Sequence, residues 1–361
     1  MSASKSAAVV GAGVLGRMLA LGLRRSGWSV TVFDRDDEAG SHSCTWTGAG
    51  MLSPYCEREA AEKLITDLGL RSMTLWPDWL KSLPTPVFYR EAGSIVVSHP
   101  PDRHELERLR RKVLDRPDAS TAMRDLDRDA LAQLEPELVP HFAGGLYFPQ
   151  ERHIDNRDLL RALADAFKRE GVTFHAGTEV NSLAAHSLEA QGRKQQFDWV
   201  FDCRGMGASE ELKDLRGVRG ELFYLHAPDV HLQRPVRLMH PRYSIYIVPR
   251  ANDVYVVGAT MVESFDLSPI SVRSSLELLT AAYSVHTGFA EARVLESSVN
   301  CRPGFPDNHP RFIVSDGLMR INGLFRHGFL ITPALVEFAL AYLDSHNVPA
   351  QAAPLWRSET P

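Results

Sequence analysis

The sequence predicts an α/β protein of two domains, in which a domain of alternating strands and helices is interrupted twice by a β-rich domain. Three observations lead to this prediction. An apolar stretch at 8–10 runs into a glycine-rich turn and then into a helical pattern. Strand and helix patterns alternate again in the middle of the chain and at its C-terminal end. Two stretches between them have the short, alternating apolar pattern of β-strands.

The domain boundaries follow from these changes of pattern. The first domain is expected to comprise residues 1–84, 151–216 and 300–361, and the β-rich domain residues 85–150 and 217–299. The chain has 361 residues, of which 44% are hydrophobic. A chain of this size and composition can bury a substantial core and is more typical of two domains than of one.

The glycine-rich turn is the strongest local signal. Gly11 permits the tight turn after the strand, Gly13 lets backbone approach a pyrophosphate, and Gly16 lets the helix pack closely on the sheet. A second strand, at 29–33, ends at Asp34, where a carboxylate can accept a hydrogen bond from a ribose hydroxyl. The pattern therefore favours a Rossmann-like dinucleotide site over an ordinary strand-turn-helix unit, without separating FAD from NAD.

The other elements of the first half have weaker signals. The patterns predict helices at 14–26, 57–68 and 71–83, two short strands within 87–97, helices at 104–114 and 125–134, a strand at 145–148, a helix between Asp155 and Gly171, and strands at 172–175 and 197–203. The segment 43–52 places small residues beside Trp46. It suits backbone close to a flat ligand, or equally a helix packed tightly through Gly48 and Gly50.

The second half begins with β patterns after a second glycine turn at 204–207. The patterns predict strands at 221–225, 244–248 and 254–257, a helix at 270–285, strands near Val294 and Phe312, a strand at 318–322, and a last helix beginning at Thr332 and Pro333.

Charge and cysteine content exclude several classes of protein. The 40 Lys and Arg against 45 Asp and Glu give a net charge of −5, so no basic field indicates nucleic acid as a partner. No stretch approaches the roughly 20 uninterrupted apolar residues that span a bilayer. The four cysteines form no Cys-x-x-Cys pair, which argues against zinc and against a disulfide framework. We therefore expect no metal and no membrane span, and a cytoplasmic protein without a signal peptide.

Candidate residues for chemistry lie late in the chain. Since no nucleophile motif is present, a bound redox cofactor is expected to supply the reactivity. Arg302 follows a strand and precedes Pro303 and Gly304, which suits a fixed guanidinium for a carboxylate. Arg326 precedes the last helix, and Tyr246 alternates with apolar neighbours on one strand face. The competing interpretation makes each arginine a surface charge and the tyrosine, like Met261 and His327, a structural residue.

Seven segments, in order, are more specific together than the glycine turn alone: 11–16, 48–52 with 56–59, 218–221, 246–250, 257–261, 302–304 and 326–330. They resemble the D-amino-acid-oxidase superfamily of FAD-dependent amine oxidases, and within it the glycine oxidases of thiamine biosynthesis. The resemblance covers nearly the whole chain. It implies a Rossmann-like FAD-binding domain interrupted by a β-rich substrate domain, and FAD bound without a covalent link.

The resemblance also implies roles for residues. Arg302 would bind the substrate carboxylate, Arg326 would help to hold the substrate, and Tyr246 and Met261 would line the pocket. The cofactor contacts would come from Gly11, Gly13, Val14, Leu15, Gly16, Asp34, Arg35, Cys44, Thr45, Ala49, Gly50, Met51, Val180, Gly304, Leu324, Arg326, His327, Gly328, Phe329 and Leu330. Asp34, Cys44 and Trp46 depart from the residues commoner in the family, namely glutamate, a small hydroxyl residue and alanine.

The activity implied is oxidative deamination of glycine or another small amino acid, with molecular oxygen as acceptor. The products would be an imine or glyoxylate, ammonia and hydrogen peroxide, and they would supply thiazole formation, with a functional link to thiazole synthase. One alternative is a D-amino-acid, sarcosine or N-methyl amino acid oxidase or dehydrogenase of the same superfamily. Another is a non-catalytic flavin-binding accessory protein. Whether the chain forms a homo-oligomer is left open.

Overall fold

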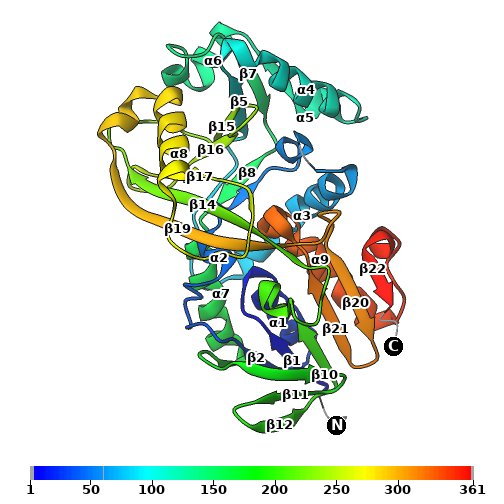
Figure 1. The fold of residues 1–361 in the computed structure, drawn as a ribbon. Coiled ribbons are helices and arrows are strands. Elements are labelled where there is room, and N and C mark those ends of the chain that lie inside the picture. Colours follow the sequence, from blue (N-terminus) through cyan, green and yellow to red (C-terminus); the bar gives the residue numbers. More distant parts are fainter. Residues whose placement is uncertain (1–3, 60, 359–361) are drawn as a thin grey trace.

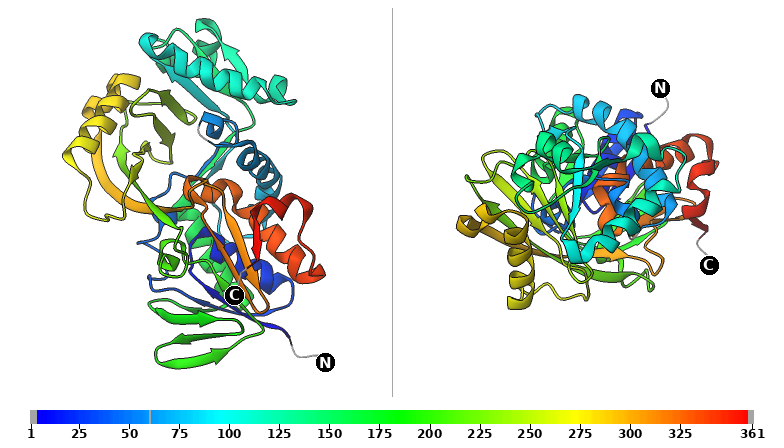
Figure 2. Two further views of the ribbon diagram at one scale, coloured as in Figure 1. Left: turned by 45° about the vertical axis from the view of Figure 1, so that its right-hand side comes forward. Right: turned by 90° about the horizontal axis from the view of Figure 1, so that it is seen from above.

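Two large sheets organise the computed structural model, which describes residues 4–59 and 61–358. The seven-stranded sheet lies in the lower part of Figure 1 and the nine-stranded sheet in the upper part. The long strands β14 (Arg216–His226) and β19 (Arg293–Gly304) pair with each other and run between these two parts (Figure 1). Seen from the side the molecule is elongated, with the sheets toward opposite ends (Figure 2).

The seven-stranded sheet has the order β22-β20-β21-β13-β1-β2-β9. Its strands are β1 (Ser6–Val10), β2 (Ser29–Phe33), β9 (Thr173–His175), β13 (Trp199–Asp202), β20 (Arg311–Ser315), β21 (Leu318–Asn322) and β22 (Trp356–Ser358). Neighbours pair in parallel except β20 and β21. These strands come from all three segments predicted for the first domain, although the boundaries themselves stay predictions. Helices α1 (Val14–Arg25), α3 (Lys63–Ser82), α7 (Asn156–Glu170) and α9 (Gly328–Ser345) share its apolar core.

The nine-stranded sheet has the order β18-β14-β17-β16-β15-β5-β7-β6, with β19 paired to β14. Its other strands are β5 (Ser94–Ser98), β6 (Arg124–Leu126), β7 (Gly145–Phe148), β15 (Val236–Met239), β16 (Ile245–Pro249), β17 (Val254–Gly258) and β18 (Val262–Glu263). Helices α4 (Arg103–Leu114) and α8 (Val272–Val285) pack against it. Smaller elements are α2 (Cys44–Thr47), α5 (Ala119–Ala122), α6 (Arg128–Leu134), β3 (Met51–Leu52), β4 (Tyr89–Arg90), β8 (Arg152–Ile154), β10 (Val180–Ala184), β11 (Ser187–Ala190) and β12 (Arg193–Gln196).

The α/β class and most elements are confirmed, but four predictions were wrong. One helix, α3, replaces the two predicted within 57–83, since Gly69 does not break it and instead packs against Leu330 of α9. Strand β6 occupies the start of the helix predicted at 125–134. Arg302 lies within β19, paired with Val218, and does not follow a strand.

The fourth correction concerns α9, which begins at Gly328 and not at Thr332. Pro333 therefore lies inside the helix, where its missing N–H leaves the carbonyl oxygen of Phe329 without its usual partner. The buried indole of Trp76 in α3 donates Nε1–H to that oxygen over 3.2 Å. A side chain from another helix thus compensates for the proline, and the first turn of α9 is preserved.

Among the described residues, α9 is the one helix that is long and apolar enough to cross a membrane, judged by length and composition alone. Its most apolar window, within 325–345, has a mean hydropathy of 1.3, and 61% of that window is buried. Leu340 and Val336 pack on Gly22 of α1, and Ala334 N donates to Ser72 of α3. These contacts make α9 a core helix of the seven-stranded half.

We expect Trp76→Phe to lower the free energy of unfolding by about 1–3 kcal/mol, because a buried carbonyl loses its donor. Adding Pro333→Ala should recover part of this loss, since an alanine N–H at that position can donate to Phe329. Chemical denaturation of both variants measures the effect. Trp79→Phe is the matched control, because Trp79 lies in the same helix and its ring packs on the guanidinium of Arg25. Equal losses in the single and double variants would contradict the assignment.

Candidate active site

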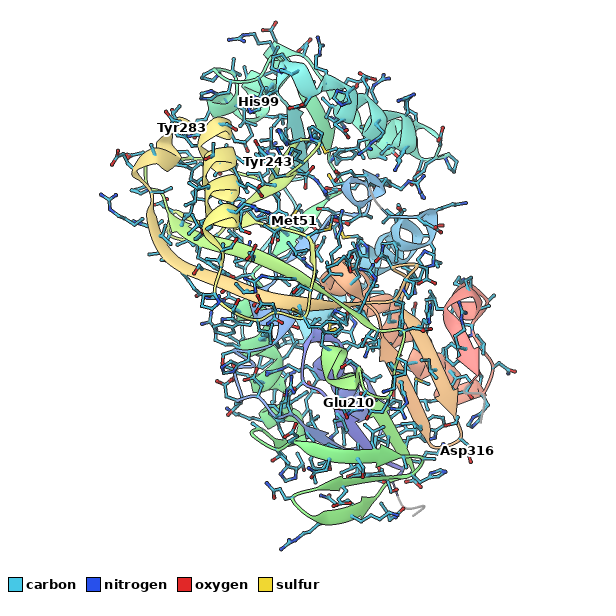
Figure 3. All side chains as sticks on the ribbon, viewed as in Figure 1. Met51, His99, Glu210, Tyr243, Tyr283 and Asp316 are labelled. Carbon is cyan, nitrogen blue, oxygen red and sulfur yellow. The ribbon has the colours of Figure 1, made fainter. Side chains whose placement is uncertain are left out.

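A cavity of about 1100 Å³ lies between the two sheets. Gly11 and Asp34 line one end of it, and Tyr246, Arg302 and Arg326 line the other. Figure 3 shows the cavity-lining Met51 near the middle of the molecule and Tyr243, which also lines the cavity, nearer α8. Residues from both halves of the chain therefore face one space.

The first end of the cavity has the geometry of an anion cradle. Gly11 has φ +99°, and a Cβ there would lie 2.5 Å from the carbonyl oxygen of Cys203. A Cβ on Gly16 would lie 1.8 Å from the carbonyl oxygen of Gly11, which explains the close packing of α1. No side chain caps α1 at Gly13, although the N–H of Val14 donates to Thr45 Oγ1 over 2.9 Å. The start of α1 thus presents backbone N–H groups and a positive helix end to the cavity.

Asp34 and Arg17 fix this cradle from two sides. The Asp34 carboxylate accepts from the N–H of Ala12 and, over 2.8 Å, from that of Asp36. Arg17 is fully buried and donates to the carbonyl oxygen of Ala12 over 2.7 Å. Burial lowers the pKa of Arg17 to about 10, against the opposing effect of Asp34. Asp34 therefore holds the glycine turn as well as lining the cavity.

The segment 44–51 forms the middle of the cavity wall. Asn156 Nδ2 donates to the carbonyl oxygens of Thr45 and Trp46 over 2.9 and 2.7 Å, and Arg250 donates to that of Ala49 over 2.6 Å. A Cβ on Gly50, which has φ +62°, would lie 1.9 Å from the carbonyl oxygen of Ile154. The alternative of a helix packed through Gly48 and Gly50 was wrong, because α2 ends at Thr47 and both glycines follow it. The glycines do pack tightly, and the backbone of the segment lines the cavity.

Cys44 and Trp46, which depart from the family pattern, have defined contacts. The Cys44 sulfur lies 2.9 Å from the carbonyl oxygen of Cys301 and 3.1 Å from Asn300 Oδ1. The Arg157 guanidinium lies 4.4 Å from the ring centre of Trp46 and 4.0 Å from that of Tyr224. Arg157 is also paired with Glu296 at 2.7 Å. Trp46 therefore packs against the guanidinium of Arg157, whose charge is balanced by Glu296, at the edge of the segment.

At the other end of the cavity, two side chains lie flat on glycines of the sheet. A Cβ on Gly220 of β14 would lie 2.3–2.4 Å from the guanidinium atoms of Arg302. A Cβ on Gly258 of β17 would lie 2.9 Å from the Tyr246 hydroxyl. Arg302 donates to the carbonyl oxygen of Thr260 over 3.1 Å. The two glycines thus provide the room that Arg302 and Tyr246 occupy.

A charged cluster closes this end. Arg326 Nε donates to Glu57 Oε2 over 2.6 Å, and His327 Nδ1 lies 3.1 Å from the same oxygen. Arg237 of β15 is paired with Glu59, and its Nη1 lies 3.8 Å from Glu57 Oε1. Burial alone would raise the pKa of Glu57, but Arg326, His327 and Arg237 hold it well below its usual range. Burial lowers the pKa of His327, against the effect of Glu57.

Most of the predicted site residues line the cavity. Those that do are Gly11, Gly13, Val14, Leu15, Asp34, Arg35, Cys44, Thr45, Ala49, Gly50, Met51, Tyr246, Met261, Arg302, Leu324, Arg326, His327, Gly328, Phe329 and Leu330. Val180 lines a smaller pocket of about 80 Å³ that shares Gly11 and Asp34. Gly16 and Gly304 line neither cavity: Gly16 packs on Gly11, and Gly304 lies beside Phe325.

Sequence reasoning missed four residues that complete the site. Gly220 could have been noticed, because a glycine inside a strand often marks a close approach of another group. Arg237 sits between apolar residues of β15, and a buried arginine indicates a buried acidic partner. Glu57 lies in the segment 56–59 that resembles the family, but it was given no role, and Asn156 had no signal. Their partners lie 269 and 111 residues away in sequence.

Comparisons with known proteins agree with this geometry. The family model described as FAD dependent oxidoreductase matches residues 6–342. The chain is 41% identical over 346 residues to a putative thiamine biosynthesis oxidoreductase ThiO from Rhizobium etli, covering 96% of this chain and 98% of that protein. It is 27% identical to the bifunctional protein ThiO/ThiG from Synechocystis, covering 92% of this chain and 50% of that protein, so it spans half of the fused relative.

Solved structures share the fold. Glycine oxidase from Geobacillus kaustophilus superposes with a TM-score of 0.85 at 24% identity, over 99% of this chain and 100% of that chain. Iminodiacetate oxidase from Chelativorans sp. superposes with a TM-score of 0.83 at 23% identity, over 98% and 99% of the two chains.

The residues present also fit the cofactor of this family. Gly11 and Gly13 line the cavity at the glycine turn, where a Cβ on Gly11 would clash with the Cys203 carbonyl, and the start of α1 faces the same space. The family match covers most of the chain and includes every residue discussed above as a site residue. This protein therefore belongs to the FAD-dependent oxidoreductases and uses FAD as its cofactor.

Proposed function

We propose that this enzyme catalyses the oxidative deamination of glycine or a related small amino acid. In the overall reaction, glycine, water and dioxygen give glyoxylate, ammonia and hydrogen peroxide. The names of the ThiO and glycine oxidase relatives support this substrate class. The main observation behind the proposal is that the guanidinium of Arg302 lines the cavity and has no carboxylate partner among the described residues.

The charges around Arg302 support its role. At this end of the cavity Arg326 is paired with Glu57, and Arg237 with Glu59. Arg302 is half-buried and donates only to the Thr260 carbonyl within the described chain. Its fork-shaped set of N–H donors therefore suits the carboxylate of an amino acid, which can accept two parallel hydrogen bonds.

Tyr246 is proposed to complete the carboxylate site. Burial raises the pKa of its phenol, so the hydroxyl stays protonated at neutral pH and can donate a hydrogen bond. Bound FAD supplies the acceptor for the two electrons lost by the α C–H bond. Arg302 and Tyr246 then only bind and orient the substrate. No side chain needs to act as a base if the amine binds in its neutral form.

We expect the FAD-loaded enzyme to form hydrogen peroxide from glycine, sarcosine or D-alanine, with the ranking of kcat/KM identifying the preferred amine. Arg302→Leu should lower kcat/KM about 30- to 100-fold, because a charge-assisted hydrogen-bonded pair is lost. Arg302→Lys is the matched variant and should lose less, because it keeps the charge. Bleaching of the flavin without peroxide would indicate a dehydrogenase. No peroxide and no bleaching with any of the three amines would contradict the proposal.

A second test uses the glycine beneath Arg302. Gly220→Ala should push the guanidinium away and raise KM about ten-fold, with a smaller change in kcat, because the Arg302 side chain can shift while the sheet stays intact. Steady-state kinetics and thermal unfolding distinguish this from a folding defect. In an Arg302→Leu background, Gly220→Ala should have no further effect on KM. Additive losses would show that Gly220 acts independently of Arg302.

We also propose that FAD is held without a covalent bond. Burial raises the pKa of the Cys44 thiol to about 12 and that of Cys203 well above its usual range. Both cysteines line the cavity, and protonated thiols are poor nucleophiles. Acid precipitation of the purified enzyme should therefore leave all of the flavin absorbance in the supernatant. A yellow pellet that survives washing would contradict this prediction.

The biological role is inferred from the relatives. We infer that the product supplies thiazole formation in thiamine biosynthesis, because the chain is 41% identical to a ThiO protein and matches the ThiO/ThiG fusion over half of its length. A functional link to thiazole synthase and a cytoplasmic location are part of this proposal. The described cysteines are all free, which is compatible with a reducing compartment.

A further inference from the structure

The pair formed by Glu57 and Arg326 joins two distant segments at the end of the cavity that is lined by Arg302 and Tyr246. This end is called the substrate end below. Glu57 lies in the 3₁₀ turn Cys56–Glu59, and Arg326 in the turn Phe325–His327 that precedes α9. Their side chains are each 14% exposed, and both residues line the cavity. The pair is therefore positioned to affect what binds next to Arg302.

Most charges of this end are paired. The guanidinium groups of Arg237, Arg302 and Arg326 line it together with the carboxylates of Glu57 and Glu59, and Arg219, Glu221 and Asp266 line the cavity nearby as a separate ion-paired group. Glu59 is paired with Arg237 and also accepts from the hydroxyl of Ser244 over 3.2 Å. Glu57 is paired with Arg326. Arg302 is therefore the guanidinium of this group that has no carboxylate partner among the described residues.

We propose that Glu57 determines substrate specificity by cancelling Arg326, so that the site accepts a substrate with one carboxylate and rejects one with two. This inference rests on the proposed function, since it assumes that Arg302 receives the substrate carboxylate. Glu57 acts in two ways. It occupies the donor of Arg326 that a second carboxylate would need, and its own charge repels such a group.

The position of Glu57 is fixed by its surroundings. The buried carboxylate of Glu151 accepts from the N–H groups of Tyr55 and Cys56 over 3.0 and 2.7 Å, which anchors the turn just before Glu57. The basic groups around Glu57 hold its pKa well below the usual range. Glu57 therefore stays ionised at every pH above the pKa of an ordinary carboxyl group. Its charge continues to balance that of Arg326 through the neutral range.

One donor of Arg326, Nη2, has no hydrogen-bond partner among the described residues, and this allows the role of Glu57 to be tested. Glu57 accepts from Nε, and Nη1 lies 3.4 Å from the sulfur of Met261. Nη2 is buried without a hydrogen-bond partner among the described residues. The Nε and Nη2 hydrogens form one edge of the guanidinium, which can bind a carboxylate through two parallel bonds. A neutral side chain at position 57 would hold this edge more weakly and would not repel a carboxylate, so a second carboxylate could displace it and take both bonds.

The experiment compares the binding of acetate and malonate to FAD-loaded enzyme by isothermal titration calorimetry. Glu57→Gln should increase malonate affinity about ten-fold relative to acetate, because a second charge-assisted carboxylate pair becomes available. With amine substrates, kcat/KM for iminodiacetate relative to glycine should rise in the same variant. Glu57→Asp keeps the charge and should retain the wild-type ratio of affinities.

Two controls separate this effect from a change in net charge or a loss of folding. Glu337→Gln removes the same charge from a surface pair with Arg71 and should leave the ratio unchanged. Arg326→Gln leaves Glu57 charged without its closest guanidinium partner, so it should lower the affinity for acetate, the opposite direction to Glu57→Gln. Visible flavin absorbance and thermal unfolding report whether each variant is loaded and folded.

The double variant Glu57→Gln with Arg326→Gln tests whether the gain in malonate affinity depends on Arg326. The gain in malonate affinity should disappear in it, because the guanidinium of Arg326 is gone. An unchanged malonate-to-acetate ratio in loaded Glu57→Gln, or a gain that persists in the double variant, would overturn the proposal. These measurements need no turnover. A wild-type enzyme that fails to oxidise glycine would overturn the proposed reaction, while the binding ratios would still test the role of Glu57.

Discussion

Buried guanidinium groups hold together the segments that form the cavity, and the rest of the structure depends on satisfying them. A buried arginine must find acceptors, because an isolated charge in a protein interior is very costly. Arg17 finds them in the carbonyl oxygens of Ala12, Glu38 and Leu160. Arg250 finds them in Ala49 and Asp155. Each of these arginines joins stretches of chain that are distant in sequence, so the cavity walls are fixed by the same contacts that stabilise the fold.

The cofactor end of the site could be predicted well from sequence, and the substrate end only in part. Gly11, Gly13 and Asp34 lie close together in the chain, and their spacing alone indicates a strand, a turn and a helix. Arg302 was also found, because a proline and a glycine follow it. Its partners could not be assigned to it from sequence: Gly220 lies on β14 and Thr260 beyond β17, and only the pairing of β14 with β17 and β19 brings the three together.

Two of the errors in the predicted elements, those in α3 and α9, have a related physical cause. A glycine is unfavourable inside a helix, and a threonine followed by proline is typical of the first positions of a helix, so neither Gly69 nor Pro333 was expected inside one. In the structure Gly69 lets α3 approach Leu330, and Trp76 supplies the donor that Pro333 makes necessary. Each of the two helices therefore contains a residue that is unfavourable in a helix, and a contact with the other helix compensates for it. Local propensity could not reveal this, because the compensation lies on a different helix.

The anchoring of the segment 44–51 has a consequence for the order in which the protein assembles. This segment forms the middle wall of the cavity, yet its partners Asn156, Arg250 and Asn300 come from the later part of the chain. Contacts of such large sequence separation form late in folding, because closing long loops is entropically costly. A chain emerging from the ribosome would thus lack a finished flavin pocket until nearly all of it had been synthesised, so cofactor capture should follow folding and not guide its first steps.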